Sequence, residues 1–163
     1  MDNFEQSIQN LREQALQSRL NTLSQQVNSL ESHIQADIIM KNQLETDLRN
    51  VEDPRRRARL NQAIQENTEN LHRHEEELDS LRRTLDKILQ NHIDEDINIK
   101  NQLTNNLRVE RDERHRDRIN AEITRRTEHL HQHEEEGDNL RERLDSLKET
   151  IGSMSTLLEQ MNY

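Results

Sequence analysis

The chain of 163 residues contains 29% hydrophobic and 34% charged residues, and its net charge is −10. This composition excludes a broad globular core and leaves either disorder or long helices that bury a narrow apolar stripe. The acidic balance argues against a general nucleic-acid binder, and an aromatic content of 1% excludes a base-stacking platform or an aromatic-lined pocket.

The first predicted helix covers about residues 4–51, where apolar residues recur in steps of three and four. Its apolar stripe consists of Leu23, Val27, Leu30, Ile34, Ile38, Leu44, Leu48 and Val51. Asp37 and Lys41 interrupt this stripe with polar side chains. The helix ends before Pro54, because Asp53 can cap a new helix and a proline favours its first turn.

The second predicted helix covers about residues 55–110. Its apolar stripe consists of Leu60, Ile64, Leu71, Leu78, Leu81, Leu85, Leu89, Ile93, Ile97, Leu103 and Leu107. No glycine or proline lies between Leu85 and Ile97, so we expect this segment to be unbroken helix. A second turn is predicted at residues 109–113, where Asp112 has the capping position that Asp53 has in the first turn.

The third predicted helix covers about residues 114–161. Its apolar stripe consists of Ile119, Ile123, Leu130, Leu140, Leu144, Leu147, Ile151, Met154, Leu158 and Met161. Gly137 and Gly152 lie inside this helix, where a glycine costs about 1 kcal/mol relative to alanine. Each glycine either makes room for a bulky neighbour or marks a weak point of the helix.

Residues 30–88 repeat as residues 89–147, with 30 identities in 59 positions and no gap. The segment LHRHEEELDSL that begins at Leu71 returns as LHQHEEEGDNL at Leu130. The segment HIQADIIMKNQL that begins at His33 returns as HIDEDINIKNQL at His92. Identity of this extent indicates a tandem duplication, which the first 29 and the last 16 residues flank.

Short turns make neighbouring helices antiparallel, so we predict an all-α, elongated antiparallel three-helix bundle that forms a single domain over residues 1–163. If Val51 faces Leu60, residue i of the first helix lies opposite residue 111 − i of the second. The duplication then places residue i of the second helix opposite residue 229 − i of the third. The arrangement resembles the three-helix coiled coil of spectrin-type repeats, and this resemblance covers topology only and implies no function.

Two Glu-x-x-His pairs, Glu69 with His72 and Glu128 with His131, match the element that supplies metal ligands in di-iron bundle proteins. In the heptad phase of the stripe both pairs fall on outward positions, and the register separates them along the bundle. We therefore expect no metal site within one chain. A chain reversal near Leu89 would instead bring the two pairs together and favour a di-metal site.

His74 and His133 lie within the stripes, and the register places them opposite Asp37 and Asp96. We predict that each pair forms a buried polar layer, in which the carboxylate orients the imidazole and the layer fixes the helix register. The alternative is that both histidines reach solvent at a loosely packed level. Because a histidine beside a carboxylate titrates near neutral pH, such a layer could also respond to protons.

The first turn carries a basic patch of four arginines, Arg55, Arg56, Arg57 and Arg59. Positive charge is unfavourable at a helix N-terminus, so the patch indicates contact with an acidic partner, a phosphate or an anionic lipid. The alternative is an ordinary solvated helix end. The arginines near the second turn alternate with acidic residues and indicate ion pairs within the helix.

The sequence contains no cysteine, no glycine-rich phosphate loop and no nucleophile elbow. We therefore predict a non-enzymatic coiled-coil scaffold, spacer or protein–protein interaction module without a cofactor or a small-molecule substrate. No segment is long and apolar enough for a membrane span, and a cytoplasmic protein is expected. Ile39, Met40 and Ile99 lie beside the main stripe and favour a homodimer. The alternative function is a metal- or pH-responsive helical bundle that uses the repeated His/Glu segments.

Overall fold

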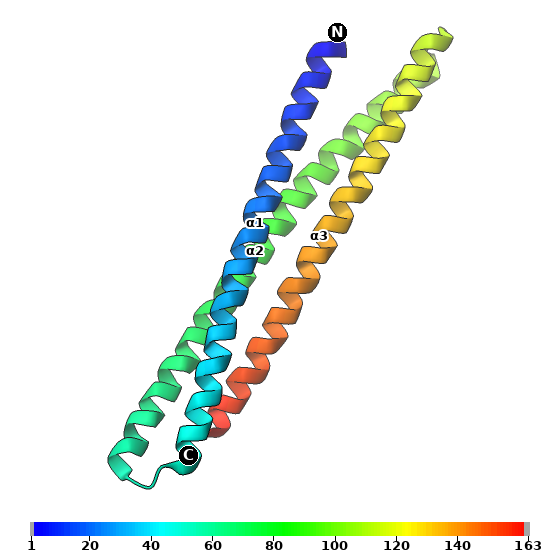
Figure 1. The fold of residues 1–163 in the computed structure, drawn as a ribbon. Coiled ribbons are helices and arrows are strands. Elements are labelled where there is room, and N and C mark those ends of the chain that lie inside the picture. Colours follow the sequence, from blue (N-terminus) through cyan, green and yellow to red (C-terminus); the bar gives the residue numbers. More distant parts are fainter. Residues whose placement is uncertain (1, 162–163) are drawn as a thin grey trace. The chain divides into compact units, whose positions relative to one another are not determined.

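The computed structural model describes residues 2–161 and contains three helices (Figure 1). These are α1 (Asp2–Asn50), α2 (Pro54–Val109) and α3 (Glu113–Met161), and the described residues form no strand. The predictions of an all-α chain and of three helices are confirmed. Each helix begins and ends within two residues of the predicted boundaries. Residues 1, 162 and 163 of the predicted domain lie outside the described residues.

Both turns use an aspartate as a helix cap. Asp53 Oδ1 accepts a hydrogen bond from the backbone N–H of Arg55 at 3.1 Å, and Asp112 Oδ1 accepts one from Arg114 at 3.2 Å. A side-chain acceptor at this position satisfies one of the N–H groups that the first turn of a helix leaves without a backbone partner. The second turn therefore forms where it was predicted, although Glu113 stands in place of the proline.

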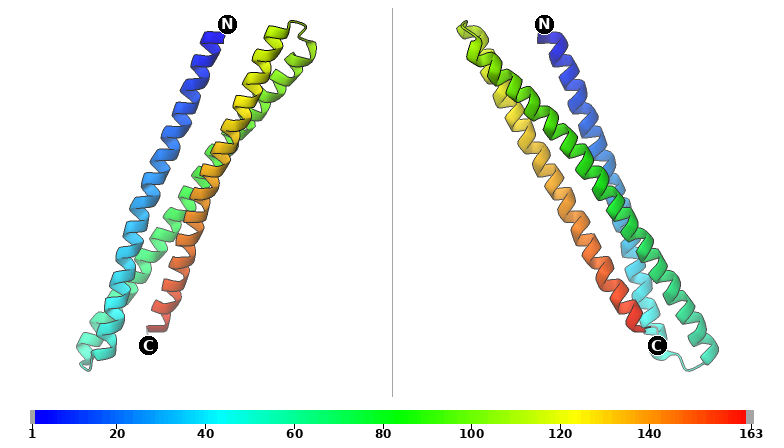
Figure 2. Two further views of the ribbon diagram at one scale, coloured as in Figure 1. Left: turned by 45° about the vertical axis from the view of Figure 1, so that its right-hand side comes forward. Right: turned by 180° about the vertical axis from the view of Figure 1, so that it is seen from behind.

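The helix α2 runs without a break through the junction of the two sequence copies (Figures 1 and 2). Leu89, at the junction, lies within the helix and is 1% exposed. The chain reversal that would have favoured a di-metal site therefore does not occur at Leu89. An unbroken helix follows from the absence of glycine and proline in this segment.

The described residues form two compact units, and each unit contains a part of every helix. One unit comprises Leu20–Arg82 and the described residues from Glu142 onwards, and we call it the apolar unit. The other comprises the described residues up to Arg19 together with Arg83–Arg141, and we call it the polar unit. The names reflect the side chains that each unit buries.

The apolar unit holds thirteen of the seventeen apolar side chains that are buried among the described residues. They are Leu20, Leu23, Val27, Leu30, Ile34, Leu44, Ile64, Leu71, Leu78, Leu144, Leu147, Ile151 and Leu158. Burying a side chain of this size contributes about 1.5–3 kcal/mol to folding. Ion pairs lie at the edge of this core, such as Lys148 with Asp79 and Arg143 with Glu31, each at 3.0 Å. This unit therefore has the narrow apolar core that the sequence pattern predicts.

The polar unit buries as many polar as apolar side chains among its described residues. Its buried apolar side chains are Leu16, Leu85, Leu89 and Leu140. Its buried polar side chains are Gln9, Asp96, Arg126 and His133. Its packing therefore depends on how these polar groups are paired, because a buried polar group without a partner opposes folding.

The predicted apolar stripe of α2 is wrong at Ile97, which is 42% exposed. Asp96 faces the interior instead and is 5% exposed. Successive helix residues are about 100° apart around the axis, so an inward Asp96 turns Ile97 toward solvent. Six other predicted stripe residues of this unit are only half-buried, namely Ile93, Leu103, Leu107, Ile119, Ile123 and Leu130.

Gly137 makes room for a buried leucine, whereas Gly152 does not. A Cβ atom at Gly137 would overlap Cδ1 of Leu89, whose side chain is buried in the core of the polar unit. A larger residue at this position would therefore push Leu89 out of place. At Gly152, no described atom outside the glycine's own helix turn lies within 4 Å of such a Cβ.

Candidate functional site

The apolar unit contains a layer of one carboxylate and two imidazoles. Asp37 Oδ2 lies 2.6 Å from Nδ1 of His74, and both side chains are largely buried. The ring of His33 stacks on that of His74, with 5.7 Å between the ring centroids. The Asn67 amide donates a hydrogen bond to the backbone carbonyl of Asp37 at 3.4 Å. The structure thus brings together the two residues that the helix register placed opposite each other.

The polar unit contains the corresponding residues in a different arrangement. His92 Nε2 lies 3.1 Å from Asp96 Oδ2, but neither atom makes a hydrogen bond of good geometry with any described residue. The His133 ring packs edge-on against that of His92, at 4.7 Å between centroids. Nδ1 of His133 is buried and has no hydrogen-bond partner among the described residues. No hydrogen bond joins Asp96 to His133 within the described part of the chain, so this predicted pair is not brought together as Asp37 and His74 are.

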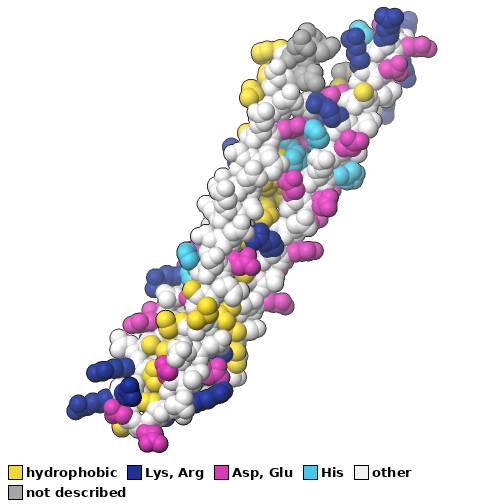
Figure 3. Space-filling model, viewed as in Figure 1, with side chains coloured by type: hydrophobic (Ala, Val, Ile, Leu, Met, Phe, Trp, Pro, Cys, Tyr) yellow, Lys and Arg dark blue, Asp and Glu magenta, His cyan; other side chains and the backbone are white. Residues whose placement is uncertain are grey.

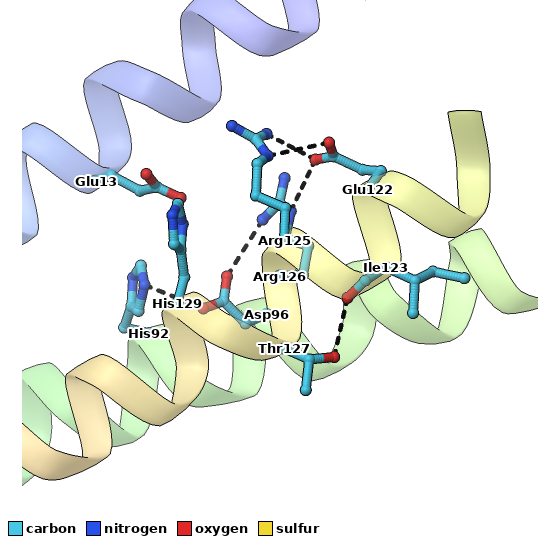
Figure 4. A network of polar contacts seen from close by, with 9 residues as sticks. All are labelled: Glu13, His92, Asp96, Glu122, Ile123, Arg125, Arg126, Thr127 and His129. Atoms are coloured by element: carbon cyan, nitrogen blue, oxygen red, sulfur yellow. Dashed lines mark hydrogen bonds and ion pairs between the residues drawn. The ribbon is translucent and has the colours of Figure 1, made fainter. Parts of the chain in front are cut away.

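Arg126 explains the difference between the two layers. Its Nη1 donates to Asp96 Oδ1 at 3.2 Å and its Nε donates to Glu122 at 3.3 Å (Figure 4). The residue 59 positions earlier is Asn67, which has no charge with which to attract a carboxylate. The guanidinium therefore holds Asp96 where the neutral amide leaves Asp37 free to bind a histidine.

The charges around Asp96 and His133 shift their pKa values. Burial opposes ionisation of Asp96, but the contacts with His92 and Arg126 outweigh it and hold the pKa of this carboxyl below its ordinary value. Burial lowers the pKa of His133, and the neighbouring His92 lowers it further. At neutral pH the layer therefore contains an ionised Asp96 and an uncharged His133.

A second group of charges connects α1 to α3 within the polar unit. Glu13 of α1 contacts Nδ1 of His129, and both side chains remain about a quarter exposed (Figure 4). Glu122 accepts a hydrogen bond from Arg125 at 2.8 Å. Burial opposes ionisation of Glu122, but its bonds to Arg125 and Arg126 outweigh it and lower the pKa of the carboxyl. The hydrogen bond to Glu122 in turn raises the pKa of Arg125.

An open groove runs beside this group of charges. Its lining consists of Asn10, Glu13, Gln14, Gln17, His129, Gln132 and His133. The groove gives solvent and protons access to the edge of the layer. Its polar lining is unlike the hydrophobic lining typical of a pocket for a small organic ligand.

The two Glu-x-x-His pairs do not form a common site. The side chain of His72 is 58% exposed and that of His131 is 75% exposed. The carboxylates of Glu75 and Glu134 lie 4.0 Å from these two rings, one helical turn further along. The glutamates of both pairs are exposed as well. Among the described residues, no group of three or more His, Asp or Glu side chains could hold a metal ion.

Sequence reasoning missed six residues of the polar unit's network, namely Glu13, His92, Glu122, Arg125, Arg126 and His129. Two signals were present. His92 is identical to His33 in the other sequence copy. Arg126 lies three residues after Ile123 and four before Leu130, which is a stripe position. His129 and Glu13 carry no comparable signal, because neither lies on a predicted stripe.

Comparison with known proteins identified no matching family model, curated protein or solved structure. Within the described residues, no helix combines the length and the apolar character needed to cross a membrane. The function therefore has to be inferred from the surfaces and the polar network of this chain alone.

Proposed function

We propose that the chain is a non-enzymatic scaffold or interaction module that binds protein partners through the faces of its helices. The observation that carries this proposal is a set of apolar side chains exposed on the unit with the larger core. On α1, Ile39 is 69% and Met40 52% exposed, and on α3, Leu157 is 39% exposed. In Figure 3, hydrophobic side chains gather over the lower half of the view, on this unit.

The exposed residues favour a second copy of the chain as one partner. The apolar unit already buries thirteen apolar side chains, so its own core does not require Ile39 or Met40. A helix with apolar residues outside its main stripe gains stability when a second surface covers them. The same patch on a second copy offers matching apolar residues, and contact between identical patches produces a closed dimer.

We further propose that the helices pack as an antiparallel three-helix coiled coil that arose from the tandem repeat. Two ion pairs between α2 and α3 support this. Arg82 of α2 pairs with Asp145 of α3 in the apolar unit. Asp86 of α2 pairs with Arg141 of α3 at 2.7 Å in the polar unit. The two arginines are 59 residues apart, as are the two aspartates. Equivalent residues of the two copies therefore form both pairs, with the arginine on α2 in the first pair and on α3 in the second.

Light scattering coupled to size-exclusion chromatography tests the dimer. The wild-type chain is expected at twice its mass of 19.5 kDa, and the double variant Ile39→Gln/Met40→Gln at the mass of one chain. Leu11→Gln, at another exposed leucine, is the matched control and should leave the dimer intact. A wild-type protein that is monomeric, or a double variant that remains dimeric, contradicts this proposal.

The basic patch is a second proposed contact surface, for a short acidic segment of a protein partner. Arg55, Arg56, Arg57 and Arg59 are exposed, and the first turn of α2 contains no acidic residue. Arg57 donates to the carbonyl of Val51 at 3.4 Å, whereas the other three form no ion pair with any described residue. The patch is only about 6 Å long along the helix, so it suits a short acidic segment better than an extended membrane surface.

Fluorescence anisotropy with a labelled Asp/Glu-rich peptide tests the basic patch. We expect binding that weakens as the salt concentration rises, because added ions screen exposed charges. Changing the four arginines to glutamine should abolish this binding. Changing Arg108, Arg111 and Arg114 near the second turn is the matched control and should preserve it. Equal loss in both variants would show a nonspecific charge effect and contradict the assignment.

A further inference from the structure

We propose that the polar unit is sensitive to acid and that His133 is the residue responsible. In this proposal, a proton on His133 loosens the contact of the α1 segment up to Arg19 with α2 and α3 in that unit. The apolar unit keeps its packing under the same conditions. This inference goes beyond the docking function proposed above and does not depend on it, because the residues involved are different.

No carboxylate near His133 makes a hydrogen bond to its Nδ1 among the described residues. From α2 it faces His92 and Asp96, and from its own helix His129. Glu13 of α1 is the other carboxylate near it. Asp96 is already bound by Arg126, and Glu13 is in contact with His129. A proton on His133 would thus place a new cation between two imidazoles and close to a guanidinium.

The other two histidines each lie beside a carboxylate. His129 is in contact with Glu13, and this pair is about a quarter exposed, so solvent screens its charges. His92 Nε2 lies 3.1 Å from the carboxylate of Asp96. His133 is 7% exposed and has no such partner, so its protonation carries the largest cost.

The α1 segment of the polar unit has little apolar contact to offset that cost. Leu16 is its only buried apolar side chain among the described residues, and Gln9 is its buried polar side chain. The amide nitrogen of Gln9 has no hydrogen-bond partner among the described residues. Segments with few buried apolar contacts open locally at a small free-energy cost, so this segment should be the first to detach.

The direction of the pH effect follows from the environment of His133. Burial, followed by the neighbouring His92, makes the pKa of His133 lower in the folded chain than in the unfolded chain. The uncharged ring therefore favours the folded state at pH values above the ordinary histidine value of about 6.5. This contribution is lost as the pH falls below that value, until the folded chain also takes up the proton. Asp96 stays ionised over this range, because its pKa is below the ordinary value for aspartate.

The apolar unit provides an internal comparison. There Asn67 stands where the polar unit has Arg126, and Asp37 lies 2.6 Å from Nδ1 of His74. A proton on His74 would have a carboxylate beside it. The substitution Arg126→Asn should give the polar unit the same arrangement, by releasing Asp96 toward His133.

Amide hydrogen exchange measured by mass spectrometry at about pH 7.5 and about pH 5.5, corrected for intrinsic exchange rates, tests the proposal. In the wild-type chain, protection of residues 7–19 is expected to fall about tenfold, or ~1.4 kcal/mol, at the lower pH. Residues 20–34 of the same helix should change less than about twofold. His133→Gln and Arg126→Asn should remove the fall, and His131→Gln, at an exposed histidine, should retain it.

Circular dichroism at the higher pH first shows that each variant is helical. If His133→Gln does not fold, Arg126→Asn decides alone, because it keeps the histidine and removes the guanidinium that binds Asp96 and Glu122. Equal protection of the wild-type segment at both pH values overturns the proposal. A fall that persists in the folded His133→Gln variant, or in Arg126→Asn, overturns it as well.

Discussion

Replacing Leu71 with alanine is expected to lower the free energy of unfolding by about 3 kcal/mol. Leu71 is 0% exposed in the core of the apolar unit. The change removes buried methyl groups and leaves a cavity, which close-packed helices fill only in part. The free energy of unfolding should fall strongly, because Leu71 belongs to the unit that holds most of the buried apolar side chains.

Urea denaturation followed by circular dichroism measures this loss. Met40→Ala is the matched control in the same unit, because the side chain is 52% exposed. It should change the free energy of unfolding by less than about 0.5 kcal/mol, as expected for a surface position. A loss of less than about 1 kcal/mol for Leu71→Ala would contradict the assignment of this residue to the core.

The three helices could be predicted because the signals for them are local. A helix stops where an aspartate that caps the next helix follows its last stripe residue. Asp53 and Asp112 provide this cap in the two turns. The interior of α2 contains neither glycine nor proline after Pro54, so nothing in the segment around Leu89 opposes a continuous helix. Such signals depend on a few neighbouring residues and require no knowledge of the tertiary structure.

The interior of the polar unit could not be predicted in the same way. The register placed His133 opposite Asp96, but it contains no information on which of several charged neighbours a carboxylate will bind. Arg126 and His133 both lie on α3. Asp96 binds Arg126, because a guanidinium is always charged, whereas a histidine is not. The inward turn of Asp96 also exposes Ile97, which a count of apolar steps had placed in the stripe.

The two layers contain equivalent residues of the two sequence copies in different arrangements. Each layer contains two histidines and an aspartate at equivalent positions of the two copies. With Asn67 beside it, the carboxylate of Asp37 binds His74 and the layer is internally paired. With Arg126 beside it, one oxygen of the Asp96 carboxylate is bound by the guanidinium, and Nδ1 of the buried His133 has no hydrogen-bond partner among the described residues. The two layers therefore differ in whether the aspartate is bound by a histidine or by an arginine.

The layer of the apolar unit should reveal its role when its two partners are removed separately and together. His74→Leu alone is expected to lower the free energy of unfolding by about 1–3 kcal/mol, because it leaves the largely buried carboxylate of Asp37 without its partner. The double variant Asp37→Leu/His74→Leu should be neutral or more stable than the wild type by about 1 kcal/mol, because apolar side chains can replace a buried polar pair without loss.

Thermal denaturation of both variants and of Asp37→Leu completes the cycle, and His72→Leu, at an exposed histidine in the same helix turn, is the control. If the layer fixes the register, the stabilised double variant should also populate more than one alignment of the helices. Spin labels on single introduced cysteines can detect this, because the chain has no native cysteine. A double variant as unstable as His74→Leu would mean that the pair contributes net stability, and register selection would then not explain it.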